Sequence, residues 1–346
     1  MEKTITEAQG IHEGYSDEEL EMLSKLSSTF DAGFSPWATW ESENSSFGKT
    51  FREWAYFPRV LPICAASDHG VHWGATCWPN EIDNPYKAFF TWNKKKHDLM
   101  KKNHGKKSYH IPHPWVHYRK KYYPTLPENR KGTLVFFAHS NATTSPKYSD
   151  LDEYINDLKS LPDMYQPVVL CLSFHDIQKG LHKRLRKYEL PLVTAGTTNS
   201  QNFVDRFYLM ISQFRFSSSP NIGSHTFYLL EAGIPFFLFG PYPEYHIKGS
   251  KAVNDGKQNL SDYGDDDDIE NFVQFKALLS TRTDKVTEEQ RSIVSQYLGI
   301  NSEISRKKAS WILWRELFLN LDKVPIMYLT KFAKVVKKLG NKLNLR

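Results

Sequence analysis

The chain of 346 residues is poor in cysteine and has no long apolar run. Its three cysteines, Cys64, Cys77 and Cys171, lie far apart, so the sequence predicts neither a disulfide framework nor a zinc knuckle. Cysteine use of this kind is typical of a reducing cytoplasm. No stretch reaches the roughly eighteen apolar residues that span a membrane, and the acidic N-terminus lacks the apolar core of a signal peptide. We therefore expect a cytoplasmic protein.

Acidic residues are absent from residues 323–346, which carry seven basic residues. The other 38 basic residues balance 39 acidic ones, so the net charge of +6 is local and we expect no nucleic-acid partner. At helical spacing, Leu329 and Phe332 fall on one side of this segment, while Lys331 and Lys334 fall on the other. A cationic amphipathic helix of this kind binds anionic lipid. We expect peripheral association with the inner face of the cell membrane; packing of the apolar side on the protein is the alternative.

Strand and helix patterns alternate along most of the chain. A first series has expected strands at residues 60–66, 88–92 and 108–111. A second series has expected strands at residues 134–138, 168–174, 192–195, 215–218 and 236–239, with helical patterns between them. Such alternation predicts an α/β fold with helix-covered parallel sheets.

The length exceeds what one hydrophobic core usually organises, so two domains are expected. The polar, proline-marked segment 122–131 is predicted to connect them. We assign residues 1–125 to an N-terminal Rossmann-like domain and 132–300 to a second one. Residues 301–346 are expected to form C-terminal helices.

The most informative segment is residues 215–245, RFSSSPNIGSHTFYLLEAGIPFFLFGPYPEY. A strand leads through a turn of small hydroxyl residues into a helix that begins near Gly223. Backbone N–H groups and the positive end of the helix dipole bind anions at such a place. In α/β sheets, this turn lies at the carboxyl ends of the strands, where ligands bind.

We therefore predict a phosphate site in this turn; ordinary capping of the helix by the same hydroxyl groups is the alternative. The predicted site residues are Ser218, Ser219, Gly223, Ser224, His225 and Thr226. His139 and Ser140 follow the first strand of the second series, and we expect them at the same edge of the sheet. Hydroxyl and amide groups can stabilise a leaving phosphate without a metal.

The stretch SPNIGSHTFYLLEAGIPFFLFGPYPEY resembles the donor-binding segment of GT-B glycosyltransferases that build bacterial capsules and lipopolysaccharides. The shared pattern is a Ser/Thr helix start, Gly-x-Pro and an aromatic strand. The ending FGPYPEY is weakly similar to that of capsule Kdo transferases, which, like sialyltransferases, use CMP-linked donors. The resemblance implies two Rossmann-like domains around a cleft, a nucleotide-sugar held by the second domain, and a glycan or lipid-linked acceptor of surface-polysaccharide synthesis. No cofactor is implied beyond the nucleotide-sugar.

One position departs from this family pattern. Many of these transferases bind ribose through a Glu five residues before the Gly of Gly-x-Pro, where this chain has Tyr228. Glu231 lies two residues before Gly233. It is therefore either a donor ligand or an acid at the end of the helix.

The sequence Ser67-Asp68-His69-Gly70 ends an apolar strand of the first series. Transfer with inversion needs a general base that takes the proton of the acceptor hydroxyl. A carboxylate or imidazole at a strand tip can do this, so we predict that Asp68 or His69 is catalytic; a polar turn is the alternative. We expect one of the two to face the cleft, because adjacent side chains on a strand point to opposite faces.

Two other function classes stay open. A nucleotide-sugar epimerase has the same architecture, and a non-catalytic carbohydrate-binding protein could stack sugars on Trp73, Trp78, Trp92 and Trp115.

Residues 265–268 contain an Asp-x-Asp pattern that binds metal in another glycosyltransferase fold. Acids just before a helix favour its N-terminus, so we predict no metal.

Overall fold

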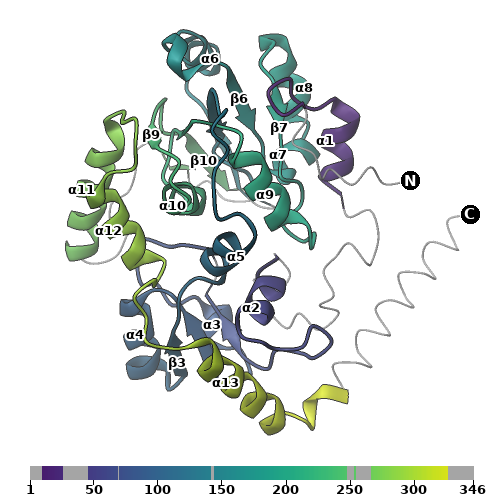
Figure 1. Ribbon diagram of the computed structural model, residues 1–346, viewed down its shortest axis with the longest axis vertical. Helices are drawn as coiled ribbons and strands as arrows, with labels where there is room; N and C mark the ends of the chain where they lie inside the picture. Colours follow the sequence, from purple (N-terminus) through teal and green to yellow (C-terminus); the bar gives the residue numbers. More distant parts are fainter. Residues whose placement is uncertain are drawn as a thin grey trace, which may run out of the picture.

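The computed structural model describes residues 10–25, 46–68, 70–141, 144–247, 253–254 and 266–325. These residues form an α/β structure with two parallel sheets, as the alternating patterns predict. Figure 1 shows the larger sheet and its helices in the upper part, and the smaller sheet in the lower part. The GT-B arrangement of two domains and their boundaries stay predictions.

The larger sheet has five parallel strands in the order β7-β6-β4-β8-β9. The strands are β4 (Thr133–Phe136), β6 (Val168–Cys171), β7 (Leu192–Val193), β8 (Phe216–Ser219) and β9 (Phe236–Leu238). Most are short apolar runs, as expected for strands that are buried on both faces. Alternate residues reach opposite faces of the sheet, so Leu134 and Val169 enter one core while Val135 and Leu170 enter another.

Helices cover both faces of this sheet. One core includes residues of α9 (Phe203–Ile211), α10 (Ser224–Glu231), α11 (Asp266–Ser280) and α12 (Glu288–Tyr297). The opposite core includes residues of α1 (Asp17–Leu23), α6 (Leu151–Lys159), α7 (Phe174–Gln178) and α8 (Leu181–Leu185). The larger sheet therefore lies in the middle of a three-layer arrangement.

The smaller sheet has three parallel strands, β1 (Ala66–Ser67), β2 (Ala88–Thr91) and β3 (Lys107–His110), in that order. Around it lie α2 (Gly48–Trp54), α3 (Pro79–Ile82), α4 (Lys94–His104) and α13 (Arg306–Leu319). Ile312 and Leu313 of α13 share a core with Phe90 of β2. The C-terminal part of the chain thus returns to the sheet formed near its beginning (Figure 1).

A helix that follows β3 joins the two parts. α5 (Pro114–Tyr122) contributes Trp115 and Tyr118 to the core beneath the larger sheet. The Tyr118 hydroxyl donates to Asp205 Oδ1 of α9 at 2.7 Å. Arg119 Nε donates to Glu231 Oε2 of α10 at 3.0 Å. Because these contacts are partly or fully buried, α5 fixes the smaller sheet against the helices of the larger one.

Two departures from the predicted elements concern strands. The expected strand at 60–66 is reduced to Ala66–Ser67, and Pro62 within it cannot donate to a strand ladder. A small antiparallel sheet of β5 (Thr144–Lys147), β10 (Glu244–Ile247) and β11 (Val253–Asn254) was not predicted. β5 is polar and contains Pro146, and β10 has only four residues, so neither gives a strong strand signal.

No helix in the part of the chain described above combines the length and apolar character needed to cross a membrane. The predicted amphipathic segment 323–346 lies outside the described residues from 326 onward. Its proposed lipid contact therefore stays a prediction.

Candidate functional site

The carboxyl edge of the larger sheet has a topological switch point between β4 and β8. From β4 the chain continues to β6 and β7 on one side, and later to β8 and β9 on the other. Ligands of open α/β sheets bind in the crevice outside such a point. His139 and Ser140 follow β4, and Gly223 leads from β8 into α10. The two predicted donor-binding segments therefore meet at this edge.

A buried carboxylate, that of Asp176, holds the loop that follows β4. Ser140 N–H donates to Asp176 Oδ1 at 3.0 Å, and the Ser173 hydroxyl donates to Asp176 Oδ2 at 2.8 Å. Asp176 is buried, whereas His139 beside it is exposed. His139 is thus available at the surface, while Ser140 next to it is held by Asp176. Asp176 was missed as a positioning residue, although its place after a predicted strand pointed to this edge.

The predicted hydroxyl groups before and within the start of α10 have partners inside the fold. Ser218 is fully buried, and its hydroxyl donates to the carbonyl oxygen of Phe237 in β9 at 2.8 Å. The Ser219 hydroxyl lies 3.0 Å from Asn221 Oδ1. The buried Thr226 hydroxyl accepts from Gly223 N–H at 3.3 Å. Ser218 thus links β8 to β9, Ser219 lies within the turn before α10, and Thr226 caps the helix. Their contact with a phosphate stays a prediction.

His225 lies in the first turn of α10 and faces β4. Its ring stacks on Phe136, with centroids 4.7 Å apart and planes 16° apart. Burial, with a smaller contribution from the charge of His139, lowers the pKa of His225 to about 3. The ring is therefore neutral at physiological pH. Its Nε2 is shielded from solvent and has no hydrogen-bond partner among the described residues.

Glu231 is not brought to this crevice. It ends α10, about 10 Å along the helix axis from Ser224 at 1.5 Å per residue. Its carboxylate pairs with Arg119 of α5, and both side chains are largely buried. The geometry matches the interpretation of Glu231 as an acid at the end of the helix; contact with a donor stays a prediction.

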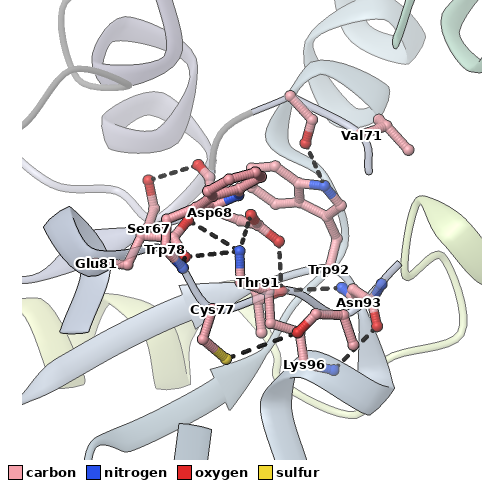
Figure 2. A network of polar contacts seen from close by, with 12 residues as sticks. Ser67, Asp68, Val71, Cys77, Trp78, Glu81, Thr91, Trp92, Asn93 and Lys96 are labelled. Carbon is pink, nitrogen blue, oxygen red and sulfur yellow. Dashed lines mark hydrogen bonds and ion pairs between the residues drawn. The ribbon is translucent and has the colours of Figure 1, made fainter. Parts of the chain in front are cut away.

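Asp68, at the tip of β1, belongs to a buried ionic cluster (Figure 2). Lys96 Nζ donates to Asp68 Oδ1 at 2.8 Å and to Glu81 Oε1 at 2.9 Å. The Thr91 hydroxyl donates to Asp68 Oδ2 at 2.8 Å. The side chains of Lys96, Asp68 and Glu81 are 1%, 1% and 6% exposed. In this conformation Asp68 holds the strand tip and does not reach a surface ligand.

The cluster contains two carboxyl groups for one ammonium group. Burial alone would lower the pKa of Lys96, but the charges of Asp68 and Glu81 outweigh it and raise that pKa. Burial, helped by repulsion from Asp68, raises the pKa of Glu81 against the attraction of Lys96. Lys96 therefore stays protonated and compensates buried negative charge. His69, the other predicted base, lies outside the described residues.

The loop after β1 contacts the start of α10. Val71 N–H donates to Ser224 Oγ at 2.9 Å. Trp92 Nε1–H donates to the carbonyl oxygen of Gly70 at 2.8 Å. Gly70 has a φ of +62°, and a Cβ there would lie 2.7 Å from Ser224 Oγ. The carboxyl edge of the smaller sheet thus meets the predicted phosphate-binding turn of the larger one.

A buried histidine supports this junction from α5. His113 Nδ1 accepts from Trp115 N–H at 3.2 Å, so in the neutral ring Nε2 carries the proton. Nε2 lies 3.0 Å from the Tyr228 hydroxyl of α10 and donates to it. Burial lowers the pKa of His113 to about 3. The pair joins the start of α5 to α10. It was not predicted from the sequence.

The other predicted features lie elsewhere. Trp73, Trp92 and Trp115 are buried, whereas Trp78 is 46% exposed. Lys95 Nζ lies 2.8 Å from Asp268 Oδ2; Asp265 lies outside the described residues. Within the described ranges, no group of three or more His, Cys, Asp or Glu side chains could hold a metal.

Two open pockets lie away from the carboxyl ends of β4 and β8. One has a volume of about 350 Å³ and is lined by residues that include Cys77, Leu99 and Asp268. The other has a volume of about 450 Å³ and lies at the start of α13. Neither is lined by a predicted catalytic or donor-binding residue.

The chain matches no protein-family model, and no curated protein or solved structure is significantly similar to it.

Proposed function

We propose that this chain is a GT-B-type glycosyltransferase that moves a sugar from a nucleotide-sugar donor to a growing surface glycan. The observation that carries the proposal is the junction between Val71 and Ser224. Through it, the carboxyl edges of two parallel sheets meet beside a topological switch point. Nucleotides bind at such points in α/β proteins, and an acceptor could approach from the other sheet.

The donor would lie between the loop after β4 and the start of α10. Backbone N–H groups of the first helical turn lack partners within the helix, and together with the helix dipole they would hold the leaving phosphate. The exposed His139 would contact the phosphate or the sugar. The neutral ring of His225 would keep the helix start packed on Phe136. In this proposal the transfer needs no metal.

The acceptor would approach from the loop after β1. Asp68 is engaged by Lys96 and Thr91, so its contribution would be to hold the loop that carries the predicted base His69. Direct attack by the acceptor hydroxyl would invert the anomeric centre. The acceptor would be a glycan or a lipid-linked glycan, reached at the membrane through residues 323–346.

Thermal unfolding with a panel of CMP, UDP, GDP and their sugar conjugates, with and without EDTA, tests the donor site. A ligand that binds only the folded state raises Tm according to its occupancy. We expect one nucleotide family to raise Tm by several degrees, unchanged by EDTA. The rise should be smaller in Ser224→Ala than in Ser16→Ala, which removes the capping hydroxyl of a distant helix. Equal rises in both variants, or no rise at all, would remove this support.

Incubation with the stabilising nucleotide-sugar separates the transferase from its rivals. Free epimer formed without an acceptor would identify an epimerase. Binding without turnover on any surface-glycan acceptor would identify a non-catalytic protein. Transfer only when an acceptor is present is the result that the proposal predicts.

A further inference from the structure

The helix α13 has an apolar face on each side. Ala309, Ile312 and Leu313 are buried against the smaller sheet. On the outer side, Trp311 is 54% exposed and Phe318 is 64% exposed. A surface helix normally directs polar residues outward. The outer face of α13 is therefore unusual for a helix that already has its apolar side buried.

Exposed apolar side chains are concentrated here. Eleven large apolar side chains in the described part of the chain are exposed, and four of them lie within residues 311–321. The four are Trp311, Phe318, Leu319 and Leu321. A cluster of this kind on a folded protein is typical of a surface that binds a partner.

The charges around this face are mainly positive. Lys307 and Lys308 are exposed in the first turn of α13, and Lys308 Nζ lies 4.7 Å from the Trp311 ring centroid. Arg315 lies 5.1 Å from the same ring. Glu316, the acid of this helix, is buried and pairs with Arg315. The exposed acid Asp322 follows the cluster beyond the end of α13, whereas cations lie beside the aromatic ring within the helix. Such a face suits a partner surface that is both apolar and anionic.

A pocket continues the face at the N-terminal end of α13. It has a volume of about 450 Å³, and its lining includes Trp54, Tyr56 and Ile304 together with the cationic Arg306 and Lys307. The Arg306 guanidinium lies 3.9 Å from the Tyr56 ring centroid. Arg306 also donates to the carbonyl oxygens of Trp54 and Glu53. Lys307 is therefore the cation that could contact an anionic headgroup whose acyl chain enters between these apolar walls.

We propose that the outer face of α13 docks on an anionic lipid bilayer. Trp, Phe and Leu insert at the level of the headgroups, and the lysines contact the anionic lipid. The absence of exposed acids within α13 favours an anionic surface over a second copy of the same cationic face. The proposed face consists of residues 307–321, and under the proposed function it would act where a lipid-linked acceptor is received.

Co-flotation of the full chain with vesicles tests this inference. We expect binding to vesicles of phosphatidylcholine with phosphatidylglycerol, and little binding to phosphatidylcholine alone. Trp311→Ala/Phe318→Ala should weaken binding at least tenfold, because the two rings supply much of the inserted apolar area. Met164→Ala, which shortens an exposed apolar side chain elsewhere, is the matched control and should leave binding unchanged.

The lysines provide a second pair of variants. Lys307→Gln/Lys308→Gln should weaken binding by about fivefold for each lysine, since each contributes about 1 kcal/mol near an anionic surface. Lys101→Gln/Lys102→Gln removes an exposed lysine pair from α4 and should have no effect. Equal losses for the two pairs would overturn the proposal, because they would reflect net charge alone.

Other results would identify another occupant. If Trp311→Ala/Phe318→Ala binds vesicles like the wild type, the binding lies outside α13 and the proposal is overturned. If the wild type ignores vesicles but forms a dimer that this variant disperses, a second copy covers the face, and the proposal is again overturned. The Tm increase with nucleotide should be the same in all variants, so this inference and the proposed function can fail separately.

Discussion

At the residue scale, the cluster of Lys96, Asp68 and Glu81 sets the cost of burying charged groups against their mutual attraction. Removing an ion from water is costly, and a buried pair is compensated only when its geometry is good. Here one ammonium group contacts two carboxyl groups at 2.8 to 2.9 Å, and Thr91 satisfies a further oxygen. The cluster therefore depends on Lys96 more than on either acid.

Lys96→Met should lower the free energy of unfolding by about 3–5 kcal/mol, since it leaves buried carboxylates without their counter-ion. Lys94→Met is the matched control in the same helical turn. It removes an exposed pair with Asp98 and should cost less than about 1 kcal/mol. Urea unfolding measures both. Equal costs would contradict a special role for the buried lysine.

Acid should destabilise the protein through its buried histidines. The pKa values of His113 and His225 lie near 3 in the folded protein, below the ordinary 6.5. Between these values the unfolded chain binds a proton at each histidine that the folded protein excludes, so stability falls as the pH falls from 6.5 towards 3. Each histidine lowers the free energy of unfolding by up to about 1.4 kcal/mol for each pH unit of this fall.

His225→Phe, which keeps the ring on Phe136 but cannot be protonated, should flatten this dependence. The free energy of unfolding of variant and wild type, measured across this pH range, checks it. The carboxylates titrate in both proteins, so their contribution cancels in the comparison. Parallel curves would show that His225 does not contribute.

Sequence reasoning located residues better than it identified their partners. The strand tip at Asp68 was found because it follows an apolar run, and the helix start at Gly223 because it follows a turn of small polar residues. Lys96 was missed, because its link to Asp68 spans 28 positions and depends on how β1 and α4 pack. Ser218 and Thr226 were predicted as ligands although their hydroxyls are satisfied inside the fold. Burial, which sets these roles, cannot be read from residue type.

At the element scale, the decisive contact lies between the loop after β1 and the start of α10. Gly70 and Gly105 have φ values of +62° and +60°, so a Cβ causes similar backbone strain at both. Nothing lies within 4 Å of the Cβ position at Gly105, whereas Ser224 Oγ lies 2.7 Å from that at Gly70. The two glycines therefore separate backbone strain from contact between the elements.

Gly105→Ala should cost about 1 kcal/mol from strain alone, and Gly70→Ala should cost more, because the Ser224 hydroxyl must leave Val71 N–H. In the double variant Gly70→Ala/Ser224→Ala, the clash disappears. Its cost should therefore be smaller than the sum of the single costs by about 0.5 kcal/mol or more. Additive costs, measured by urea unfolding, would show that the two elements are not coupled.

The regular elements were largely predictable. The five strands of the larger sheet and α6, α9 and α10 follow from apolar runs and helical spacing within one segment. β5 and β10 were missed, because Pro146 and polar neighbours give β5 no strand signal and its partner lies about a hundred positions later. α5 was missed for another reason. Its charged residues and neighbouring prolines resemble a linker, and its buried residues pack on a distant part of the chain.

At the scale of the whole molecule, two sheets are held in one arrangement by α5 and by α13. α5 connects β3 to the core of the larger sheet, and α13 returns from the larger part to pack on the smaller sheet. These crossings place the two carboxyl edges against each other at Ser224. The proposed function depends on this placement more than on any single side chain.

Amide hydrogen exchange, with and without the nucleotide-sugar that most raises Tm, tests the placement of the donor most directly. Ligand contact slows exchange by suppressing local opening. We predict slower exchange in residues 223–226 and 138–141, on the two sides of the switch point. Protection confined to other residues, such as 75–77 and 99–104 around the pocket beside α4, would contradict it.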